Sequence, residues 1–378
     1  MKKLIKAVFT SLLIIVILTF GLLLVTGRMY LLKAAWYYTA DIDDYKIFDN
    51  RTVANGQPQP WPHSANYNKI FYPDSLNKNL EETQTIALAV IRNDSLLFEK
   101  YWEGFSDSSL SGSFSVAKSI TSLGIGIALK EGKIRSLDQP VSEFLPGFNE
   151  GLKAKLTIRH LLTMSSGSDW DESYADPFSI TTEAYYGHDL YKTATRVKIV
   201  KEPGTFHTYQ SGNTQLLGLI LEKATGRTES DWISEKLWMP IGAEHPALWS
   251  LDKKNGHEKS YCCFNSNVLD FARLGQLMLD SGKWKGVPII DSAYWRQSVT
   301  PCKILDSDHQ PCDYYGYQWW ILPEDQEVFY GWGILGQYVV CIPSKKIVVV
   351  RLGKISGGTR NGNAADMVYW LRDWARSL

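Results

Sequence analysis

"GSFSVAKS", residues 112–119, places Ser115 and Lys118 three positions apart, where a polar stretch gives way to an apolar one. Residues 120–129 continue with apolar side chains at helical spacing, and Gly132 follows as a stop signal. This pattern predicts a helix with Ser115 in its first turn. Side chains at positions i and i+3 share one helix face, so the amine of Lys118 is expected beside the hydroxyl of Ser115.

Two interpretations of this pair follow from elementary chemistry. A lysine with the ordinary pKa of about 10.4 cannot accept a proton at neutral pH. Burial on an apolar helix lowers that pKa and makes Lys118 a base for Ser115. In the alternative, Ser115 caps the helix and Lys118 points into water. The same spacing recurs at residues 75–78 and 250–253, both in polar surroundings, so the spacing alone does not decide between the two.

The distribution of apolar residues along the chain predicts an α+β protein. Two β-type runs, residues 83–90 and 95–104, are separated by a short polar turn and are typical of a hairpin. Residues 134–312 favour helices and loops, and β-type runs return after residue 312, before a last amphipathic helix. We therefore expect one antiparallel sheet built from both ends of the chain and flanked by helices, with a mostly helical insertion.

The first residues differ from the rest of the chain. Lys2, Lys3 and Lys6 precede an uncharged, almost wholly apolar run over residues 7–27. This run is long enough to cross a bilayer and longer than the apolar part of a cleaved signal peptide, about 7–15 residues. The lysines place the N-terminus in the cytoplasm. We expect residues 1–33 to be an inner-membrane anchor, with the rest facing the periplasm or the cell exterior; cleavage would instead make the protein a secreted one.

The remainder divides into two parts. Residues 34–82 are rich in aromatic, Asn and Pro residues without a clear period, and are expected to be a linker and wrapping segment. Residues 83–378 are expected to form the main domain. Forty basic residues balance forty acidic ones, which argues against nucleic acid as a partner because phosphate binding needs a basic face. A small or neutral molecule is the expected partner.

The five cysteines lack the paired spacing of a structural zinc site, and the chain is expected to use no metal or cofactor. Cys302 and Cys312 flank a short polar loop and can close it with a disulfide in an oxidising compartment. The neighbours Cys262 and Cys263 are expected to be buried small residues rather than redox-active thiols.

A second stretch, "YQSGNTQLLG" at residues 209–218, places Tyr209 in a polar loop immediately before an amphipathic helix. Together with "SFSVAKS", "LTIRHLLTMSSGSDWDE", "CCFNSNVLDFARLGQLMLDSGKWKG" and "GILGQYVVCIP", in this order, it resembles the β-lactamase-related serine hydrolases. That superfamily includes class C β-lactamases, D-alanyl-D-alanine peptidases, esterases and 6-aminohexanoate-dimer hydrolases, and the pattern is most similar to the last group. The resemblance covers roughly residues 80–375 and implies the β-lactamase/transpeptidase-like fold.

The resemblance also implies roles for three residues. Ser115 would be the nucleophile, Lys118 its hydrogen-bonded partner and Tyr209 the phenolic acid or base, so an ester or amide is cleaved through an acyl-enzyme. Two alternatives stay open on the same fold. One is a D-alanyl peptidase or esterase that acts on cell-wall polymers, and the other is a non-catalytic binding or sensor module.

Four further residues are expected at the substrate. Ser211 stands where the family often has Asn, which is closer to the aminohexanoate group. Residues 331–337 contain neither the Lys nor the His of the family's third element, which argues against carboxylate recognition and penicillin-type substrates. Trp332 is expected to line the acyl pocket. By family likeness a backbone N–H near Gly336 and Gln337 would hold the oxyanion together with the N–H of Ser115.

Other candidates receive a structural interpretation. The chain has no G-x-S-x-G nucleophile elbow, which argues against a Ser-His-Asp triad. His160 is expected to be structural, whereas His207, two residues before Tyr209, is close enough in sequence to reach the pocket. Residues 169–172 are expected to form a solvated loop at the rim of the cleft, and Trp319 and Trp320 to pack in the core.

Overall fold

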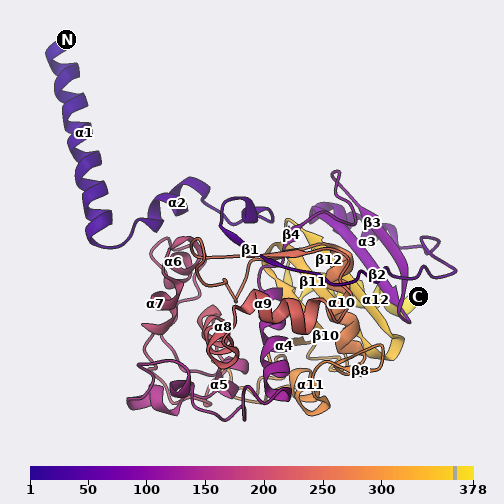
Figure 1. The fold of residues 1–378 in the computed structure, drawn as a ribbon. Helices are drawn as coiled ribbons and strands as arrows, with labels where there is room; N and C mark the ends of the chain where they lie inside the picture. Colours follow the sequence, from indigo (N-terminus) through magenta and orange to yellow (C-terminus); the bar gives the residue numbers. More distant parts are fainter. Residues whose placement is uncertain (361–363) are drawn as a thin grey trace.

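The computed structural model describes residues 1–360 and 364–378 and is built around a six-stranded sheet (Figure 1). All neighbouring strands in this sheet are antiparallel. In spatial order the strands are β3 (Ser95–Tyr101), β2 (Thr85–Arg92), β12 (Ile347–Gly353), β11 (Gln337–Ile342), β10 (Phe329–Gly333) and β9 (Trp320–Ile321). Because β2 pairs with β12, the sheet joins the two ends of the chain, as predicted.

The hairpin β2–β3 forms where the polar turn predicted it. Asn93 and Asp94 both have positive φ, 49° and 59°, which is the geometry that a tight hairpin turn requires. Within β2 the side chains alternate between two cores: Leu88 and Val90 belong to one apolar cluster, and Ala87 and Ala89 to the other. Both faces of the sheet are therefore covered.

Helices cover each face of this sheet. On the outer face, α3 (Asp74–Glu82) and α12 (Asp366–Ser377) pack against it through residues such as Leu80 and Trp374. On the inner face lie α4 (Val116–Lys130) and α10 (Val268–Leu279), which also contact the helical part of the molecule. Helix α4 thus runs between the sheet and the insertion, and its N-terminus lies where these two parts meet.

The insertion, expected to consist of helices and loops, is mostly helical but also contains short strands. Besides α10, its α-helices are α5 (Ile158–Leu162), α6 (Ile180–Tyr186), α7 (Leu190–Thr195), α8 (Ser211–Thr225), α9 (Glu229–Ile233) and α11 (Ser292–Ser298). Its strands are β5 (Ala247–Ser250), β6 (Phe264–Ser266), β7 (Lys283–Trp284) and β8 (Val287–Pro288). Strands of two to four residues are too short for an alternating pattern to show in the sequence.

The segment 34–82, expected as a linker and wrapping segment, holds regular structure. It contains the end of α2 (Tyr30–Tyr37), strand β1 (Asn50–Val53) and α3. Strand β1 pairs with β5, and the four-stranded sheet continues through β6 to β4 (Ser111–Gly112), the strand that leads into Ser115. This segment therefore supports the loop that carries the nucleophile candidate.

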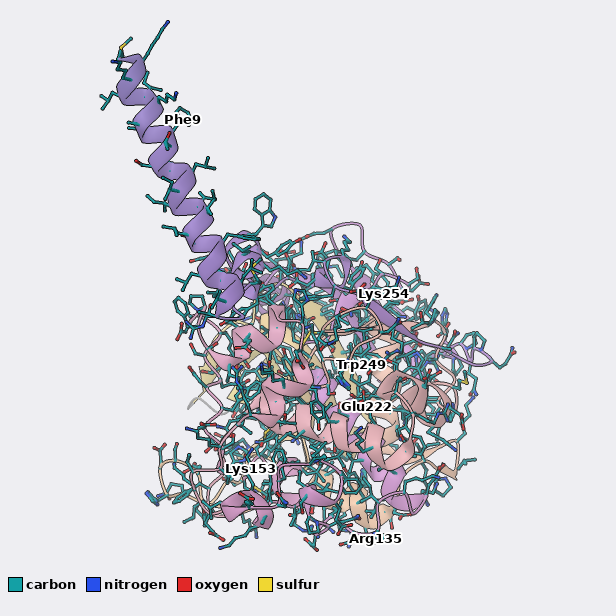
Figure 2. All side chains as sticks on the ribbon, turned by 60° about the vertical axis from the view of Figure 1, so that its left-hand side comes forward. Phe9, Arg135, Lys153, Glu222, Trp249 and Lys254 are labelled. Carbon is teal, nitrogen blue, oxygen red and sulfur yellow. A yellow bond between two sulfur atoms is a disulfide. The ribbon has the colours of Figure 1, made fainter. Side chains whose placement is uncertain are left out.

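Helix α1 (Lys2–Val25) projects from the body with its side chains, among them Phe9, exposed along its length (Figures 1 and 2). Its mean hydropathy of 2.9 and its 24 residues make it long and apolar enough to cross a membrane. A signal sequence satisfies the same criterion, so length and composition alone leave both predicted fates of this segment open.

Candidate active site

Ser115 and Lys118 are in direct contact at the N-terminus of α4. Lys118 Nζ donates a 2.8 Å hydrogen bond to Ser115 Oγ and a 3.0 Å bond to the carbonyl oxygen of Tyr261. Within the described residues, the Ser115 hydroxyl makes no capping bond to the helix, and Lys118 is only 1% exposed. The interpretation of this pair as a cap and a solvated lysine is therefore wrong. The residue before the nucleophile, Phe114, has a φ of 44°, an unfavourable value for a non-glycine residue that is typical of functional turns.

The environment of Lys118 changes its protonation. Burial lowers the pKa of this amine to about 8, and the negative charge of Glu172 partly opposes that shift. A lysine with such a pKa is partly neutral near physiological pH, and a neutral amine can accept the proton of a hydroxyl.

Tyr209 completes a three-residue cluster. Lys118 Nζ lies 4.9 Å from the centre of its ring. Burial and the charge of Glu172 raise the pKa of Tyr209, and a hydrogen bond with the Ser115 side chain lowers it in part. The phenol is therefore protonated at neutral pH and can give its proton to a leaving group.

The position of Tyr209 is fixed by the turn before α8. Gln210 Nε2 donates to the carbonyl oxygens of Ser168 at 3.0 Å and Trp170 at 2.8 Å, which ties this turn to the preceding loop. Helix α8 approaches the Trp170 ring so closely that a Cβ on Gly212 would lie 2.3 Å from it. Glycine is required at this position. The close packing fixes the start of α8, and with it Tyr209, relative to the loop that carries Trp170.

A second network holds the loop behind Lys118. Thr121, on α4, donates to Glu229 Oε1 at 2.7 Å and to the carbonyl oxygen of Ser260 at 3.0 Å. Ser260 Oγ also donates to Glu229. Because the Tyr261 carbonyl follows directly in this loop, these bonds keep the acceptor of Lys118 in place.

Glu172 is a site residue that the sequence analysis missed. Its carboxylate accepts hydrogen bonds from the backbone N–H and the hydroxyl of Ser211, both at 2.6 Å, and from the hydroxyl of Tyr174 at 2.6 Å. Glu172 lies at the cavity, where a rim loop was expected, but its carboxylate is bound by protein groups and is not merely solvated. Ser211, predicted to bind substrate, lies at the site but directs its hydroxyl to Glu172. Acidic residues after a glycine turn look alike whether they face water or a pocket, so the sequence held no distinguishing signal.

Ser115 lies where two cavities meet. The α2-side cavity measures about 710 Å³ and is lined by Ser115, Ser211 and residues of α2, of the segment 174–186, and of the loop 334–335. The Tyr209-side cavity measures about 380 Å³ and is lined by Ser115, Glu172, Tyr174, His207, Thr208, Tyr209, Ser307, Tyr314, Trp320, Trp332 and Ile334.

Some of the tryptophans and histidines considered in the sequence analysis line the Tyr209-side cavity, and the others have structural roles. Trp332, expected at the acyl pocket, and His207 both line the Tyr209-side cavity. Trp320 also lines this cavity, with the centre of its ring 4.9 Å from that of Trp332, so its predicted core role was wrong. Trp319 is buried in the core, as predicted. His160 has a structural role because its side chain accepts the backbone N–H of Thr157 in a capping box.

Gly336 and Gln337, near which a backbone N–H was expected to hold the oxyanion, are not among the residues that line either cavity. The carbonyl oxygen of Gly336 accepts a 2.6 Å bond from Arg351, and the buried Gln337 side chain bonds Gly353. The chain turns inward through a short 3₁₀ helix (Ile334–Gly336), in which Leu335 has a φ of 60°. Ile334, like Ser115, lines both cavities.

The strand before Ile334 comes close to the nucleophile loop. A Cβ on Gly333 would lie 2.2 Å from the carbonyl oxygen of Ser113. Only glycine permits that approach. The C-terminal end of β10, at Gly333 and the following Ile334, therefore lies beside the loop that carries Ser115.

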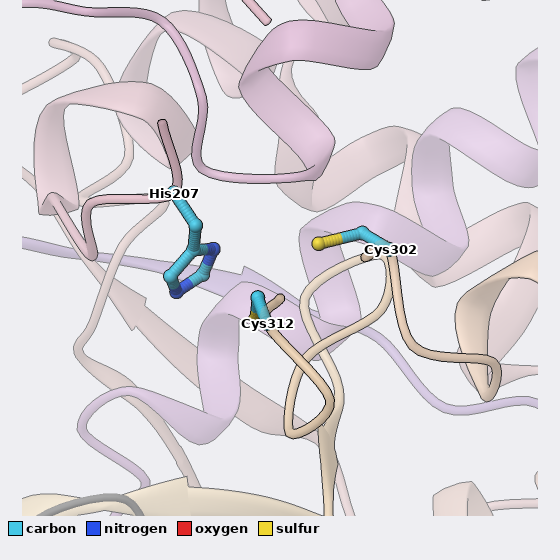
Figure 3. A group of neighbouring side chains, drawn as sticks. All are labelled: His207, Cys302 and Cys312. Carbon is cyan, nitrogen blue, oxygen red and sulfur yellow. The ribbon is translucent and has the colours of Figure 1, made fainter. Parts of the chain in front are cut away.

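A group of possible metal ligands adjoins the Tyr209-side cavity. One ring nitrogen of His207 and the sulfurs of Cys302 and Cys312 lie within 4.8 Å of one another, and Figure 3 shows the Cys302 sulfur directed toward the imidazole. Cys302 and Cys312 are thiols, not the disulfide that the sequence allowed. A hydrogen bond with Cys312 lowers the pKa of Cys302. Two sulfurs and an imidazole are ligands that zinc accepts.

Cys262 and Cys263 are buried, as predicted, but they are joined by a disulfide that the sequence analysis did not anticipate. Cys262 also lines the α2-side cavity. The bridge lies directly after Tyr261, whose carbonyl accepts the bond from Lys118.

An antiparallel sheet packed on a helical part, with a cluster of Ser115, buried Lys118 and Tyr209 between them, defines the β-lactamase-fold class of hydrolases. A family model described as Beta-lactamase matches residues 74–263, and the chain belongs to this family. It is similar to the 6-aminohexanoate-dimer hydrolase of Paenarthrobacter ureafaciens, with 29% identity over 298 residues that cover 74% of this chain and 75% of that protein. The predicted resemblance is confirmed.

Solved structures give the same fold. The structure of a proposed 6-aminohexanoate-dimer hydrolase from Bacillus anthracis has a TM-score of 0.72 and 22% identity, and the match covers 90% of this chain and 93% of that one. A penicillin-binding protein from Bacillus halodurans has a TM-score of 0.60 and 19% identity, with coverage of 80% and 99%. The predicted α+β, β-lactamase/transpeptidase-like fold is thereby confirmed.

Proposed function

We propose that this protein is a serine hydrolase that cleaves an ester or amide through an acyl-enzyme on Ser115. The observation that carries the proposal is the 2.8 Å contact between Lys118 Nζ and Ser115 Oγ, with the amine buried and its pKa lowered to about 8. A nucleophile, its base and a phenol next to both are the parts that acyl transfer needs.

The steps follow from these positions. Neutral Lys118 takes the proton of Ser115 while Oγ attacks the carbonyl carbon. Tyr209 gives its proton to the leaving alcohol or amine, the bond between the carbonyl carbon and the leaving atom breaks, and Lys118 returns a proton to the phenolate. Water then attacks the carbonyl carbon of the acyl-enzyme and gives a proton to the Lys118–Tyr209 pair. The bond between that carbon and Ser115 Oγ breaks, and the pair returns a proton to Ser115 Oγ.

The negative oxygen of the tetrahedral intermediate requires hydrogen-bond donors. The N–H of Ser115 lies at the N-terminus of α4, where backbone N–H groups and the helix dipole favour negative charge. The edge of β10 at Gly333 and Ile334 would provide the second donor, in place of Gly336 and Gln337. One such donor is worth about 3 kcal/mol in the transition state.

The charge of the cavities favours a neutral substrate. Among the described residues, neither cavity is lined by Lys or Arg, and Glu172 adds a negative charge to one of them. A substrate with a free carboxylate, such as a D-alanyl peptide, would have no cation to pair with there. Neutral esters and linear amides fit better, and the name of the similar protein from Paenarthrobacter ureafaciens points to linear amides.

The test is covalent labelling of the full chain with a fluorophosphonate, detected by intact mass. Wild type should gain one adduct, Ser115→Ala none, and the neighbouring Ser113→Ala should label like wild type because Ser113 does not line a cavity. Absence of an adduct in wild type, or an adduct retained in Ser115→Ala, would contradict the proposal. Steady turnover of p-nitrophenyl butyrate would further exclude a pure binding module.

We also propose that α1 remains attached as a membrane anchor with the domain outside the cytoplasm. Support comes from its length, its hydropathy and the three lysines in its first turns, Lys2, Lys3 and Lys6. Protein extracted from membranes should have the mass of the full chain, and its domain should be accessible to protease added outside cells or spheroplasts. A mass that lacks α1 would show cleavage.

A further inference from the structure

The α2-side cavity is much larger than a short acyl group needs. It measures about 710 Å³ and has Ser115 in its wall. Its lining contains no charged side chain among the described residues and is mainly apolar and aromatic, including Leu31, Ala34, Ala35, Phe178, Tyr186 and Ile334. Such a lining excludes ionic substrates and favours a hydrocarbon chain.

One wall of this cavity is the first helix after the apolar α1. Helix α2 begins at Tyr30, five residues after α1 ends at Val25. It is held against the body because Tyr30 is buried and Tyr37 stacks on Tyr186 with the ring centres 6.4 Å apart. Both views show α1 leaving the molecule from this side (Figures 1 and 2). If α1 spans a bilayer, the cavity lies next to the membrane surface.

The surface around α2 has the composition of a membrane interface. Trp36 and Tyr38 are 83% and 87% exposed, and Phe178 is 62% exposed. The guanidinium of Arg28 lies 5.7 Å from the centre of the Phe178 ring. Exposed aromatic residues together with basic ones are typical of the level of lipid headgroups.

The position of Tyr209 decides which half of the substrate enters each cavity. Tyr209 lines the smaller cavity and not the α2-side one. Because the phenol must reach the leaving atom, the leaving group occupies the Tyr209-side cavity, where Glu172, His207 and Ser307 offer polar contacts. The acyl half must therefore extend into the α2-side cavity.

We propose, on the basis of the function proposed above, that the α2-side cavity is an acyl-chain site and that the substrate is a long-chain acyl ester entering from the bilayer. The Ser115 Oγ–acyl bond forms as the ester bond breaks, the leaving alcohol takes its proton from Tyr209, and water releases the fatty acid and restores the serine hydroxyl. The polar alcohol half occupies the Tyr209-side cavity until the ester bond breaks, and its departure leaves room there for the attacking water.

Chain-length dependence tests this inference on the detergent-solubilised full chain. With p-nitrophenyl butyrate, octanoate, dodecanoate and palmitate, kcat/KM should rise by up to about fourfold per added methylene, which corresponds to about 0.8 kcal/mol, until the cavity is filled. Ala34→Phe and Ala35→Phe narrow the cavity at its α2 wall. They should lower the ratio of kcat/KM for the long esters to kcat/KM for butyrate by about tenfold or more. Leu32→Phe, on a residue of α2 that does not line the cavity, is the matched control.

The outcomes separate this inference from the proposed function. Hydrolysis of butyrate and labelling of Ser115, with a flat chain-length profile or with no effect of the α2 variants, would overturn the acyl-chain site and leave the hydrolase standing. Absence of labelling and of all turnover would overturn both. Retained fluorophosphonate labelling in Ala34→Phe shows that the variant is folded.

A second arm identifies the source of the chain. The full-length protein is placed in vesicles of dioleoylphosphatidylcholine, and free oleate is measured by mass spectrometry. Oleate release that is lost in Ser115→Ala assigns the lipid itself as a substrate. Hydrolysis only of p-nitrophenyl palmitate dissolved in the same vesicles keeps the acyl-chain site and assigns another long-chain ester. Failure to cleave either from the bilayer would contradict entry from the membrane.

Discussion

Two lysines of this chain are almost fully buried, yet their surroundings differ. Lys118 is 1% exposed and Lys259 0% exposed, and burial lowers their pKa values to about 8 and about 7. Lys118 Nζ contacts a hydroxyl at 2.8 Å. Lys259 Nζ instead donates a long 3.4 Å bond to the carbonyl oxygen of Ala184 and lies 4.7 Å from the centre of the Phe48 ring.

The comparison shows what makes a buried amine a candidate base. Desolvation gives both lysines a low pKa, so the pKa does not separate them. Only Lys118 has a hydroxyl to deprotonate, a phenol beside it and two cavities at that hydroxyl. A perturbed pKa therefore nominates a residue, and the geometry around it assigns the role.

The largest expected difference between the two lysines is in activity. Lys118→Ala should lower kcat/KM for p-nitrophenyl butyrate by about a thousandfold, because it removes the base that activates Ser115. Lys259→Met should stay within about twofold of wild type, since that amine touches neither Ser115 nor a cavity. Losses of similar size in both variants would mean that activity depends on a buried lysine as such and not on contact between Lys118 and Ser115.

A phenol comparison tests the third member of the cluster. Tyr209→Phe should lower kcat/KM by about a hundredfold, because the leaving group loses its proton donor. Tyr330→Phe is the control, since that tyrosine is also buried but lies in the core on the outer face of the sheet. The loss at Tyr209 should be smaller for p-nitrophenyl esters, whose leaving group needs little protonation, than for alkyl esters. An equal loss on both substrates would argue against a proton-transfer role.

The sequence was informative where the chemistry is local. Ser115 and Lys118 are three residues apart on one helix, so their contact follows from helix geometry, and Tyr209 was located by resemblance to a motif. The hairpin and the sheet joining both chain ends were also predictable, because each strand is long enough to show its pattern and the turn residues tolerate positive φ.

The sequence was uninformative where position depends on distant packing. Glu172 reaches the site only because the loop before it is tied to the α8 turn through Gln210. Ile334 lines both cavities, whereas the carbonyl oxygen of nearby Gly336 binds Arg351, fifteen residues further along the chain. Neither cavity has a sequence signature, since their walls come from segments that are far apart in the chain.

Glu172 offers a way to sharpen the Lys118 side of the comparison. In wild type, kcat/KM should rise with pH through about 8, because the amine of Lys118 must lose its proton to act as a base. Glu172→Gln removes the negative charge that raises the pKa of Lys118, so this rise should move to lower pH. Asp171→Asn, at an exposed neighbour, should leave the pH profile unchanged. A shift to higher pH in Glu172→Gln would contradict the assignment of Lys118 as the titrating base.

The smallest effect is expected on the stability of the Lys259 variant. In the folded chain Lys259 has a pKa of about 7, whereas an unfolded lysine has about 10.4. Between these values the unfolded chain binds more protons, so the free energy of unfolding rises with pH. Lys118, with a pKa of about 8, also makes the free energy of unfolding rise with pH, but only above about pH 8. Lys259→Met should therefore stabilise the protein by about 1–2 kcal/mol at pH 7 and flatten the rise between pH 7 and 8. Denaturant unfolding of the solubilised full chain measures both, and an unchanged slope would mean that Lys259 does not titrate in that range.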